Sequence, residues 1–351
     1  MDEAGSSEME RRMNDDSPTL TVPGAPAIPG LAFRRFRGEA DYAAMVEILN
    51  ACNAADQLDY VNIIDEIAWV FSHLTNCDPY RDMLFAEVNG TAIAFSRVWW
   101  TDEAFAGVVQ RLYKSLGFVH PDWRRRGLGA AMLHYDEHRL RAMAQGHPPE
   151  MDKRFQVWAT GTEEGARALF AAAGYEPVRH YIMMVRPIGL PLPHAPLPAG
   201  LEVRPAEQAQ IRAIWEAMWE ARRDHWGYVE PTAQEYSRWT KGRLFDPGLW
   251  KVAWDGGKVA GMVLNRLDEA QNEAHQRLRG YTQDVFVRRP WRRRGLARAL
   301  LVQSIQMFRQ MGMAETALGV DTENPSGALR LYESLDYREV QRHTFYDKAM
   351  D

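Results

Sequence analysis

Residues 288–297, RRPWRRRGLA, form a basic turn from which the fold of the chain can be worked out. The turn follows the short apolar run 285–287 (VFV). After it, apolar residues recur at spacings of three and four, at Leu296, Leu300, Leu301, Ile305 and Phe308. This spacing predicts one face of a helix, so the sequence reads as strand, basic turn and helix.

Such a turn has the chemistry of an anion site. A helix N-terminus carries unpaired N–H groups and a partial positive charge, so it attracts anions. Gly295 and Ala297 leave backbone N–H groups uncovered, and the neighbouring arginines offer bidentate donors for phosphate oxygens. The pattern predicts pyrophosphate binding. Taken alone, three adjacent arginines are also typical of a solvated surface or of a nucleic-acid contact.

The turn occurs twice in the chain. Residues 120–133, HPDWRRRGLGAAML, lie 168 positions upstream of residues 288–301, and 8 of these 14 positions are identical. A spacing of domain size indicates a duplicated domain, because solenoid repeats are far shorter.

The two copies resemble the acetyl-CoA-binding core of the GCN5-related N-acetyltransferase (GNAT) superfamily. The strand, the Arg-x-x-Gly-x-Gly/Ala turn and the helix carry this resemblance, and residues 324–337 (NPSGALRLYESLDY) resemble the family's next motif. It covers roughly residues 31–186 and 201–351, as in tandem members of the superfamily. It implies an α/β (mixed α+β) fold, with a mixed central sheet flanked by helices in each domain, and acetyl-CoA as acyl donor without a metal.

Composition narrows the classes of protein that remain. The chain has 351 residues, 46% hydrophobic and 25% charged, which suits a globular protein of two domains. A net charge of −5 argues against general nucleic-acid binding. No apolar run reaches the ~18 residues of a membrane span. Cys52 and Cys77 form no disulfide framework or metal-ligand spacing, so we expect a cytoplasmic protein.

The sequence divides into four parts. Residues 1–30 are acidic and polar and predict a disordered tail. Residues 31–186 form a first unit with a hairpin signal at Asn89-Gly90, and residues 201–351 form a second unit with the corresponding signal at 255–257. Between them, residues 187–200 hold five prolines and predict an extended linker; a proline-rich ligand for a partner is the alternative.

The resemblance implies a cofactor site in the second unit. The backbone of the strand would hold the pantetheine arm, the turn would take the pyrophosphate, and the start of the next motif would contact the cofactor arm. In that order the residues are Val285, Phe286 and Val287; Arg292, Arg293, Arg294, Gly295, Leu296 and Ala297; and Asn324. Tyr332 matches the family's proton donor to the leaving thiolate, and a phenol suits that role.

The first unit keeps the turn but not the acid. Its candidate cofactor-binding residues are Phe118, Val119, Arg124, Arg125, Arg126, Gly127, Leu128 and Gly129. When Gly165 is aligned with Gly327, Phe170 falls opposite Tyr332 and Thr162 opposite Asn324. Phenylalanine cannot donate a proton. We therefore expect the first unit to be non-catalytic, although it can still bind CoA.

The general base stays open at this point. Tyr281 stands where several family members carry a glutamate, and Gln283 shares its face by strand alternation. Asp284 is the only carboxylate on the strand, but regular alternation places it on the opposite face unless a bulge re-aims it. A chain of water molecules is a further alternative.

The acceptor site is predicted only by region. Aromatic and acidic side chains in this region suit a small cationic amine, and packing of an amphipathic helix explains its tryptophans equally well. The residues are Trp215, Trp219, Asp224, His225, Trp226, Tyr228 and Glu230.

The leading hypothesis is therefore an acetyl-CoA-dependent N-acetyltransferase. It acts on a primary amine of a small acceptor, with no nucleic acid or membrane as partner. A non-catalytic acyl-CoA-binding or interaction protein is the alternative, and nucleic-acid binding through the arginines ranks third.

Overall fold

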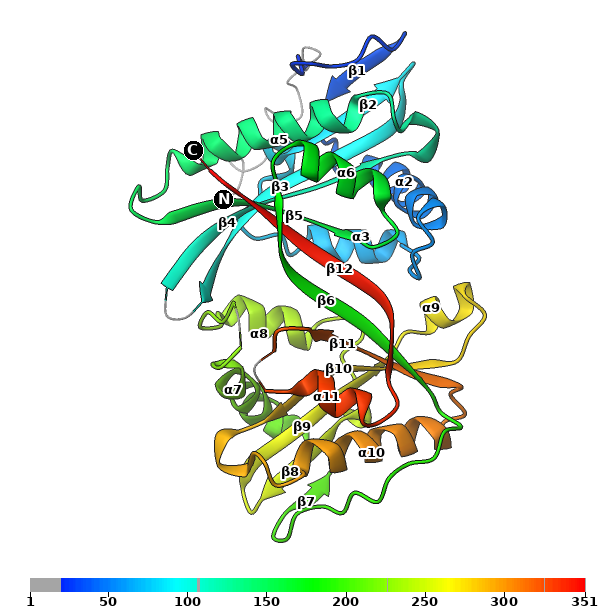
Figure 1. Cartoon of the computed structure of the whole chain (residues 1–351), viewed down its shortest axis with the longest axis vertical. Coiled ribbons are helices and arrows are strands. Elements are labelled where there is room, and N and C mark those ends of the chain that lie inside the picture. The colour runs from blue at the N-terminus through cyan, green and yellow to red at the C-terminus, as the bar shows by residue number, and fades with distance from the viewer. Residues whose placement is uncertain (1–19, 106–107, 226, 325, 351) are drawn as a thin grey trace, which may run out of the picture. The chain divides into compact units, whose positions relative to one another are not determined.

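The protein has a mixed α/β fold built on a large sheet, as predicted (Figure 1). A computed structural model describes residues 20–105, 108–225, 227–324 and 326–350. The strand order is β1-β2-β3-β4-β5-β12-β6-β11-β10-β9-β8-β7. β10 and β11 are parallel, whereas the hairpin pairs such as β8 and β9 are antiparallel.

The strands and helices are bounded as follows. The strands are β1 Leu31–Arg34, β2 Met83–Val88, β3 Thr91–Phe105, β4 Val108–Val119, β5 Asp152–Thr160, β6 Glu176–Pro187, β7 Glu202–Arg204, β8 Lys251–Asp255, β9 Lys258–Leu267, β10 Arg279–Val287, β11 Glu315–Asp321 and β12 Arg338–Ala349. The α-helices are α2 Tyr42–Ala55, α3 Ile64–Phe71, α4 Pro79–Asp82, α5 Leu128–Ala144, α6 Glu164–Ala172, α7 Ile211–Arg222, α8 Ala233–Thr240, α9 Glu269–Ala274, α10 Leu296–Gln310 and α11 Ala328–Glu333. The 3₁₀ turns are η1 Gly38–Asp41, η2 Pro121–Trp123, η3 Gln208–Gln210, η4 Pro247–Leu249 and η5 Arg289–Trp291.

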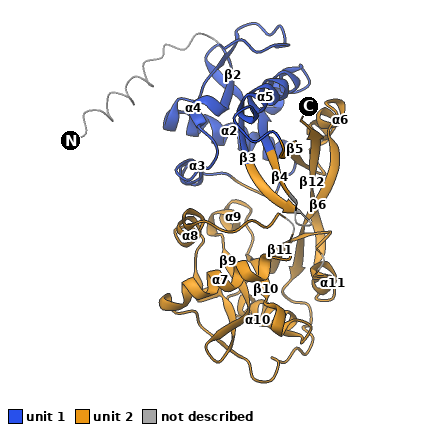
Figure 2. Ribbon diagram, turned by 90° about the vertical axis from the view of Figure 1, so that its left-hand side faces the viewer, with its two compact units in different colours: residues 1–58, 62–100, 113–149 blue, residues 59–61, 101–112, 150–351 orange. Residues whose placement is uncertain are grey.

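The chain divides into two compact units (Figure 2). Unit 1 holds residues 1–58, 62–100 and 113–149, and unit 2 holds residues 59–61, 101–112 and 150–351. The predicted boundary between residues 186 and 201 follows the sequence repeat. The division by contacts differs from it because β5 and β6 belong with unit 2.

The closing strands of the two repeats explain this difference. β12, the last strand of the second repeat, pairs with both β5 and β6. β6, the last strand of the first repeat, pairs on its other side with β11. The two strands run side by side through unit 2 (Figure 1). The second half of the molecule is therefore completed by a strand that the first repeat supplies.

Helices cover both faces of the sheet in unit 2. On one face α10 buries Leu296, Leu300, Leu301, Ile305 and Phe308, all the residues of the predicted apolar face. On the other face α7 packs Trp215 and its neighbours against Met262, Leu264 and Phe286 of the sheet. The side chains of β10 and β11 therefore point alternately toward α10 and α11 or toward α7.

Unit 1 repeats this arrangement. Asn89 and Gly90 have positive φ angles of 51° and 84° and form the predicted hairpin turn between β2 and β3. α5 packs on one face of these strands and α2 on the other.

The proline-rich linker is anchored along its length. The guanidinium of Arg186 is buried and donates to the carbonyls of Leu190 and Pro191, at 3.1 and 2.8 Å. Arg309 donates to the carbonyls of Ile188 and Leu190. These bonds fix the segment against α10, so it is not free to act as an extended ligand over this stretch.

The linker also has a counterpart before the first unit. Residues 20–31 (LTVPGAPAIPGL) and 190–201 (LPLPHAPLPAGL) share six of twelve positions. In each segment the second-last residue is a glycine of positive φ, Gly30 and Gly200. Within the first segment Val22 is 5% exposed and packs beside Phe33. The predicted disorder of residues 1–19 lies outside the described residues, whereas residues 20–30 pack on unit 1.

Candidate active site

The turn between β10 and α10 has the backbone of an anion site. Gly295 has a φ of 85° and Arg293 a φ of 59°, so two residues of positive φ flank Arg294, whose φ is not positive. Such alternation directs successive N–H groups into one concavity. No side chain caps the N-terminus of α10, which leaves its first N–H groups to a ligand. The first repeat reproduces the turn, with φ angles of 62° at Arg125 and 86° at Gly127.

The first arginine of each turn is held by protein groups. Arg292 Nε donates to the carbonyl of Val287 at 2.8 Å, Nη1 to Asp224 at 2.5 Å and Nη2 to the carbonyl of Ala221 at 3.2 Å. In the first repeat, Arg124 Nε likewise donates to the carbonyl of Val119 at 3.0 Å. These arginines fix the turn to the end of the preceding strand, and their guanidinium groups are already held by protein groups.

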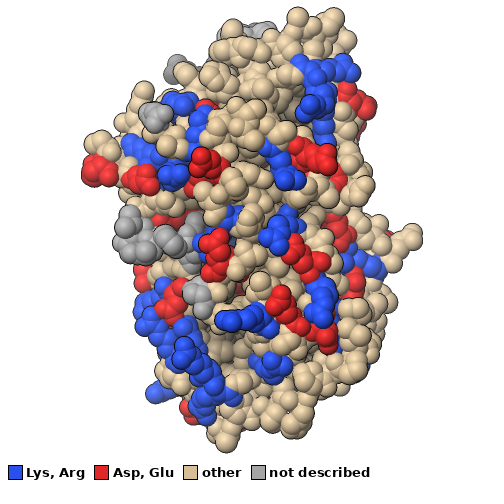
Figure 3. Space-filling model, viewed as in Figure 1, with Lys and Arg blue, Asp and Glu red and all other residues tan. Residues whose placement is uncertain are grey.

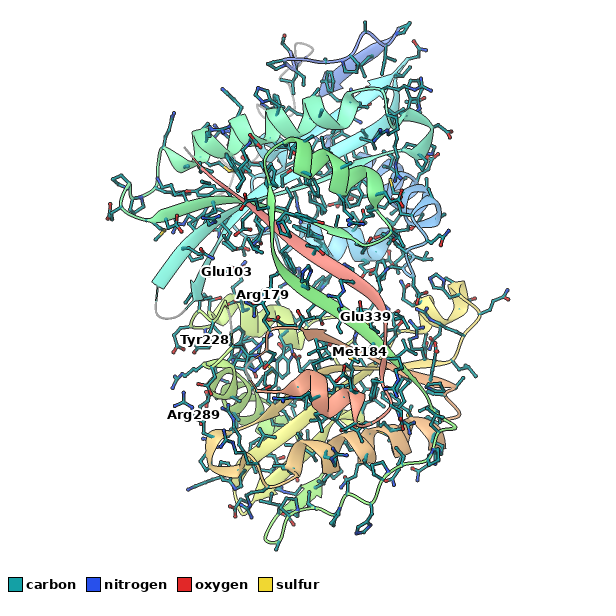
Figure 4. The ribbon with its side chains drawn as sticks, viewed as in Figure 1. Glu103, Arg179, Met184, Tyr228, Arg289 and Glu339 are labelled. Carbon is teal, nitrogen blue, oxygen red and sulfur yellow. The ribbon has the colours of Figure 1, made fainter. Side chains whose placement is uncertain are left out.

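The next two arginines are exposed in both turns. Arg293 and Arg294 reach solvent, and Arg294 also donates to the carbonyl of Ala199. Arg125 and Arg126 are exposed in the same way. Figure 3 shows a band of Lys and Arg along one side of unit 2, in the area where Figure 4 labels Arg289. Beneath the two turns Leu296 and Leu128 are buried, while Ala297 and Gly129 are half-buried.

The strand before the second turn separates from its parallel neighbour. β10 pairs with β11 only over residues 279–282 and 315–318. Beyond this point residues 284–287 pair with β9 alone among the described strands. The backbone of Val285, Phe286 and Val287 therefore has an edge without a partner strand, which a pantetheine arm can use for hydrogen bonds. The counterparts Phe118 and Val119 end β4 in the first repeat.

A bulge in β10 changes the face on which Asp284 lies. Thr282 pairs with Asn265, and Asp284 pairs with the adjacent residue Leu264, so Gln283 is the extra residue. Leu264 belongs to the α7 face, whereas Thr282 and Asn265 hydrogen-bond on the α10 face. The bulge therefore brings Asp284 onto the α7 face, the alternative that regular alternation excluded.

The Asp284 carboxyl lies in an unusual environment. Burial raises its pKa above the ordinary range of aspartate, and the charges of Arg222 and Arg266 oppose this shift only in part. No hydrogen-bond donor contributes to the shift. A half-buried carboxylate with a raised pKa is a stronger base than an exposed one.

Tyr332 lies on α11, whose N-cap is Gly327. Its side chain is 6% exposed, and its ring meets Tyr337 edge-on with centroids 6.2 Å apart. Burial raises the pKa of the phenol, and the charges on Tyr337, Tyr181 and Asp284 act in the same direction. The phenol therefore keeps its proton at neutral pH.

The equivalent positions in the first repeat are apolar. The ring of Phe170 packs beside those of Tyr175 and Tyr346, with ring centroids 6.0 and 5.7 Å apart. Leu116 stands 168 residues before Asp284. Neither side chain can donate or accept a proton.

Asn324 stabilises its own loop. Its Oδ1 accepts a hydrogen bond of 2.9 Å from the N–H of Ser326, and its carbonyl accepts from Gly327. This turn precedes α11, whose N-cap is Gly327. The contact of Asn324 with a cofactor stays a prediction.

The predicted acceptor region serves several roles. Trp215 is buried among other rings, including that of Trp239 at 5.0 Å, so core packing explains it. Trp219 packs against Trp215 in the same cluster. Asp224 pairs with Arg289 and Arg292 and has a lowered pKa as a result.

Three other residues of this region remain available to a ligand. His225 lies over Phe286 with ring centroids 5.6 Å apart, and burial lowers its pKa. Tyr228 and Glu230 both contact the exposed Arg223. Trp226 lies outside the described residues.

Sequence reasoning missed two features of the site. The first is the binding of Arg292 by Asp224; the equal spacing of 168 residues between Asp56 and Asp224 and between Arg124 and Arg292 was the available signal. The second is Tyr181 on β6, whose hydroxyl lies beside Gly319 because β6 pairs with β11.

Two further tests concern other classes of protein. Across the described ranges no group of three or more His, Cys, Asp or Glu side chains is placed to hold a metal ion. Within the same part of the chain, no helix is both long and apolar enough to cross a membrane.

Comparisons with known proteins agree with this geometry. Residues 212–337 match the model described as Acetyltransferase (GNAT) family, and residues 79–177 match the model described as Acetyltransferase (GNAT) domain. A mycothiol acetyltransferase from Frankia alni is 30% identical over 338 residues, covering 92% of this chain and 96% of the relative. The chain belongs to the GNAT acetyltransferase family.

Other acetyltransferases match most of the chain in sequence or in fold. A mycothiol acetyltransferase from Geodermatophilus obscurus is 28% identical, covering 84% of this chain and 90% of the relative. The crystal structure of a GCN5-related N-acetyltransferase from Sphaerobacter thermophilus superposes with a TM-score of 0.69 at 26% identity, covering 94% of this chain and 97% of that one. A tandem GNAT protein from the clavulanic acid biosynthesis pathway has the same fold, with a TM-score of 0.63 at 12% identity. The match covers 92% of this chain and 99% of that one. The GNAT family uses acetyl-CoA as acyl donor, so acetyl-CoA-dependent acetylation is the activity that membership supports.

Proposed function

We propose that the protein is an acetyl-CoA-dependent N-acetyltransferase that acetylates a primary amine of a small acceptor in its second repeat. One observation carries this proposal. The charge of Asp284 acts on the phenol of Tyr332 where β10 separates from β11, while the corresponding residues of the first repeat are Leu116 and Phe170. A module that only binds acyl-CoA has no need of such an acid and base.

The residues around the second turn fit acetyl-CoA. The free N–H groups at the start of α10, together with Arg293 and Arg294, would take the pyrophosphate. The open edge at Val285–Val287 would hydrogen-bond the pantetheine amides. Leu296 and Ala297 would support the turn from below, and Asn324 would shape the loop beside it. The bound thioester supplies the acetyl group.

The two proposed catalytic side chains act on different groups, one on the amine and the other on the leaving sulfur. Asp284 lies on the α7 face and Tyr332 lies on α11, so they approach the gap between β10 and β11 from opposite faces of the sheet. Asp284 would take a proton from the amine as its nitrogen bonds to the acetyl carbon. Tyr332 would give its proton to the sulfur as the C–S bond breaks. Solvent then restores the proton on Tyr332 and removes the one on Asp284.

The first repeat is assigned a supporting role. Its turn repeats the backbone of the second, so Gly127 and the exposed Arg125 and Arg126 can still bind CoA. It lacks the acid and the base. We propose that residues 31–186 bind CoA or stabilise the second repeat. Residues 201–351 would catalyse the acetyl transfer.

The names of the relatives support a small-molecule acceptor. The mycothiol acetyltransferase from Frankia alni covers 92% of this chain, and the side chains that we assign to the acceptor side are His225, Tyr228 and Glu230. A carboxylate and aromatic rings suit an ammonium group.

The experiment is a panel of amino sugars, polyamines and arylalkylamines, incubated with acetyl-CoA while free thiol is measured. We expect amine-dependent thiol release by the parent protein. Release that is equal with and without every amine, from protein shown by calorimetry to bind CoA, would instead support the acyl-CoA-binding alternative.

A further inference from the structure

One tyrosine from the first repeat reaches the candidate site of the second. Tyr181 lies on β6, which pairs with β11 in the register Tyr181 to Asp321. A Cβ atom added at Gly319 would lie 1.8 Å from the Tyr181 hydroxyl. Only glycine at position 319 therefore allows the phenol to cross β11 toward β10.

The position of Tyr181 is fixed on both sides. Arg179, two residues earlier on β6, forms an ion pair with Asp321 at the end of β11, with Nε to Oδ2 at 2.7 Å. The N–H of Thr322 donates to the carbonyl of His180 at 3.1 Å. Figure 4 labels Arg179 on this part of β6. The strand is thus clamped to β11 beside the tyrosine.

Tyr181 lies on the same face of the sheet as Asp284. Met183 and Val185, which share the face of Tyr181 by strand alternation, pack with Ala317 and Tyr281. Tyr281 and Asp284 lie on the α7 face, away from α10 and its turn. Tyr181 nevertheless remains 38% exposed. Part of the Tyr181 side chain therefore reaches solvent on the side of the sheet opposite the turn before α10.

Electrostatic coupling agrees with this placement. Burial raises the pKa of Tyr181 to about 12, and Asp284 is the charged group that adds most to the rise. Arg266 and Arg222 lower the pKa, and Asp321 raises it. These four charged groups all belong to the second repeat.

The first repeat has no equivalent opening. Met183 pairs with Gly319, and the equivalent residue Phe345, 162 positions later, pairs with Trp158. Trp158 therefore stands where the second repeat has Gly319. Its ring lies beside that of Phe345, with ring centroids 6.4 Å apart. The position corresponding to Tyr181 holds His343. The pairing of a tyrosine with a glycine is specific to the repeat that has the acid and base.

We infer that Tyr181, carried by the last strand of the first repeat and admitted by Gly319, is an acceptor-binding residue of the second repeat's active site. The first repeat thus supplies part of the site as well as a homologous fold. This inference rests on the proposed N-acetyltransferase function, which it deepens by naming a residue on the acceptor side.

The first test needs no acceptor and no activity. The full-length protein is prepared with 3-nitrotyrosine at position 181, and its absorbance is titrated with and without Asp284→Asn. We expect Asp284→Asn to lower the pKa of the nitrophenol, and the remote exposed change Glu202→Gln to leave it unaltered. An equal pKa with and without Asp284→Asn would overturn the inference, because the two residues would not share a site.

The second test separates the acceptor side from the donor side. Calorimetry with CoA compares Tyr181→Phe and Gly319→Ala with Gly257→Ala, a control whose added Cβ meets nothing within 4 Å. We expect CoA affinity within about twofold of the parent for all three folded proteins. A loss of more than tenfold in Tyr181→Phe would overturn the assignment to the acceptor side. Both tests remain decisive even if the amine panel refutes the proposed function, so the two failures are distinguishable.

Discussion

Arg292 and Asp224 are joined by an ion pair of 2.5 Å that recurs between Arg124 and Asp56 at 2.7 Å, 168 residues earlier. In each case the carboxylate follows a helix on one face of the sheet, and the arginine also bonds to the carbonyl at the end of the strand. The pair therefore connects the helix, the strand and the turn that follows the strand. A duplicated contact of this kind identifies the first arginine as a support of the turn.

The first prediction concerns this support. Asp224→Asn should weaken CoA binding about tenfold, because Arg292 loses a charge-assisted partner and the turn loosens. The pair is partly exposed, so the free energy of unfolding should fall by only ~1 kcal/mol. Calorimetry and denaturant unfolding measure the two effects. The matched control Asp56→Asn should leave turnover at the parental rate, and equal losses of turnover in both variants would contradict this division.

The second prediction concerns the turn itself. Gly295→Glu should abolish CoA binding by the second repeat, because the carboxylate repels pyrophosphate at a backbone position that favours glycine. A Cβ atom at position 295 meets nothing within 4 Å, so the fold should survive. Gly295→Ala carries the same backbone strain without the charge and should retain more affinity. Gly127→Glu should weaken CoA binding in the first repeat and leave most turnover intact; loss of turnover there would move the active site to the first repeat.

The third prediction is the pH dependence of the base. Asp284 must be ionised to accept a proton, and its pKa is raised by burial. The value of kcat/KM should therefore fall with decreasing pH at a midpoint above the ordinary aspartate value of about 4. Asp284→Asn should lower kcat by about 10²–10⁴ and remove this limb of the profile. An unchanged acid limb in the asparagine variant would show that another group is titrating.

The fourth prediction concerns stability in the first unit. The Asp136 carboxyl accepts hydrogen bonds from Ser96 at 2.8 Å and Ser115 at 2.7 Å, and burial raises its pKa to about 7. Because the folded state holds this proton more tightly than the unfolded chain, its stabilisation is complete below about pH 4. It is lost as the pH rises through about 7.

Thermal unfolding between about pH 5 and 8 measures this effect. The unfolding midpoint of the parent should fall with rising pH, by the equivalent of about 2 kcal/mol. Asp136→Asn should flatten the dependence, and Glu47→Gln, at an exposed position of α2, should not. An equally steep fall in Asp136→Asn would exclude this carboxyl as the cause.

The parts of the fold that follow local rules were predictable from the sequence. The apolar spacing from Leu296 to Phe308 identified the buried face of α10, and Asn89-Gly90 identified a hairpin. The paired turns predicted a helix start after each basic segment, and the Asn-to-Tyr motif predicted the helix that carries Tyr332. Each of these signals lies within some fifteen residues, where periodicity and turn chemistry determine the structure.

The remaining features depend on pairing between distant segments. The exchange of β6 and β12 joins Tyr181 to Asp321 and Tyr346 to Val157, and no local pattern specifies such partners. The bulge at Gln283 appears only in the register of β10 against β9. It decides whether Asp284 lies on the α7 face or the α10 face, and alternation alone predicted the wrong one of the two.

The most direct test of the account is Tyr332→Phe, which removes one hydroxyl and leaves the packing against Tyr337 in place. Once an acceptor amine is found, steady-state turnover and CoA affinity are measured on the same preparations. A positioned acid contributes about 10²–10⁴ in rate, so kcat should fall by that factor while CoA affinity stays within about twofold of the parent. A Tyr332→Phe protein that turns over at the parental rate would contradict the assignment of Tyr332 as proton donor in the second repeat.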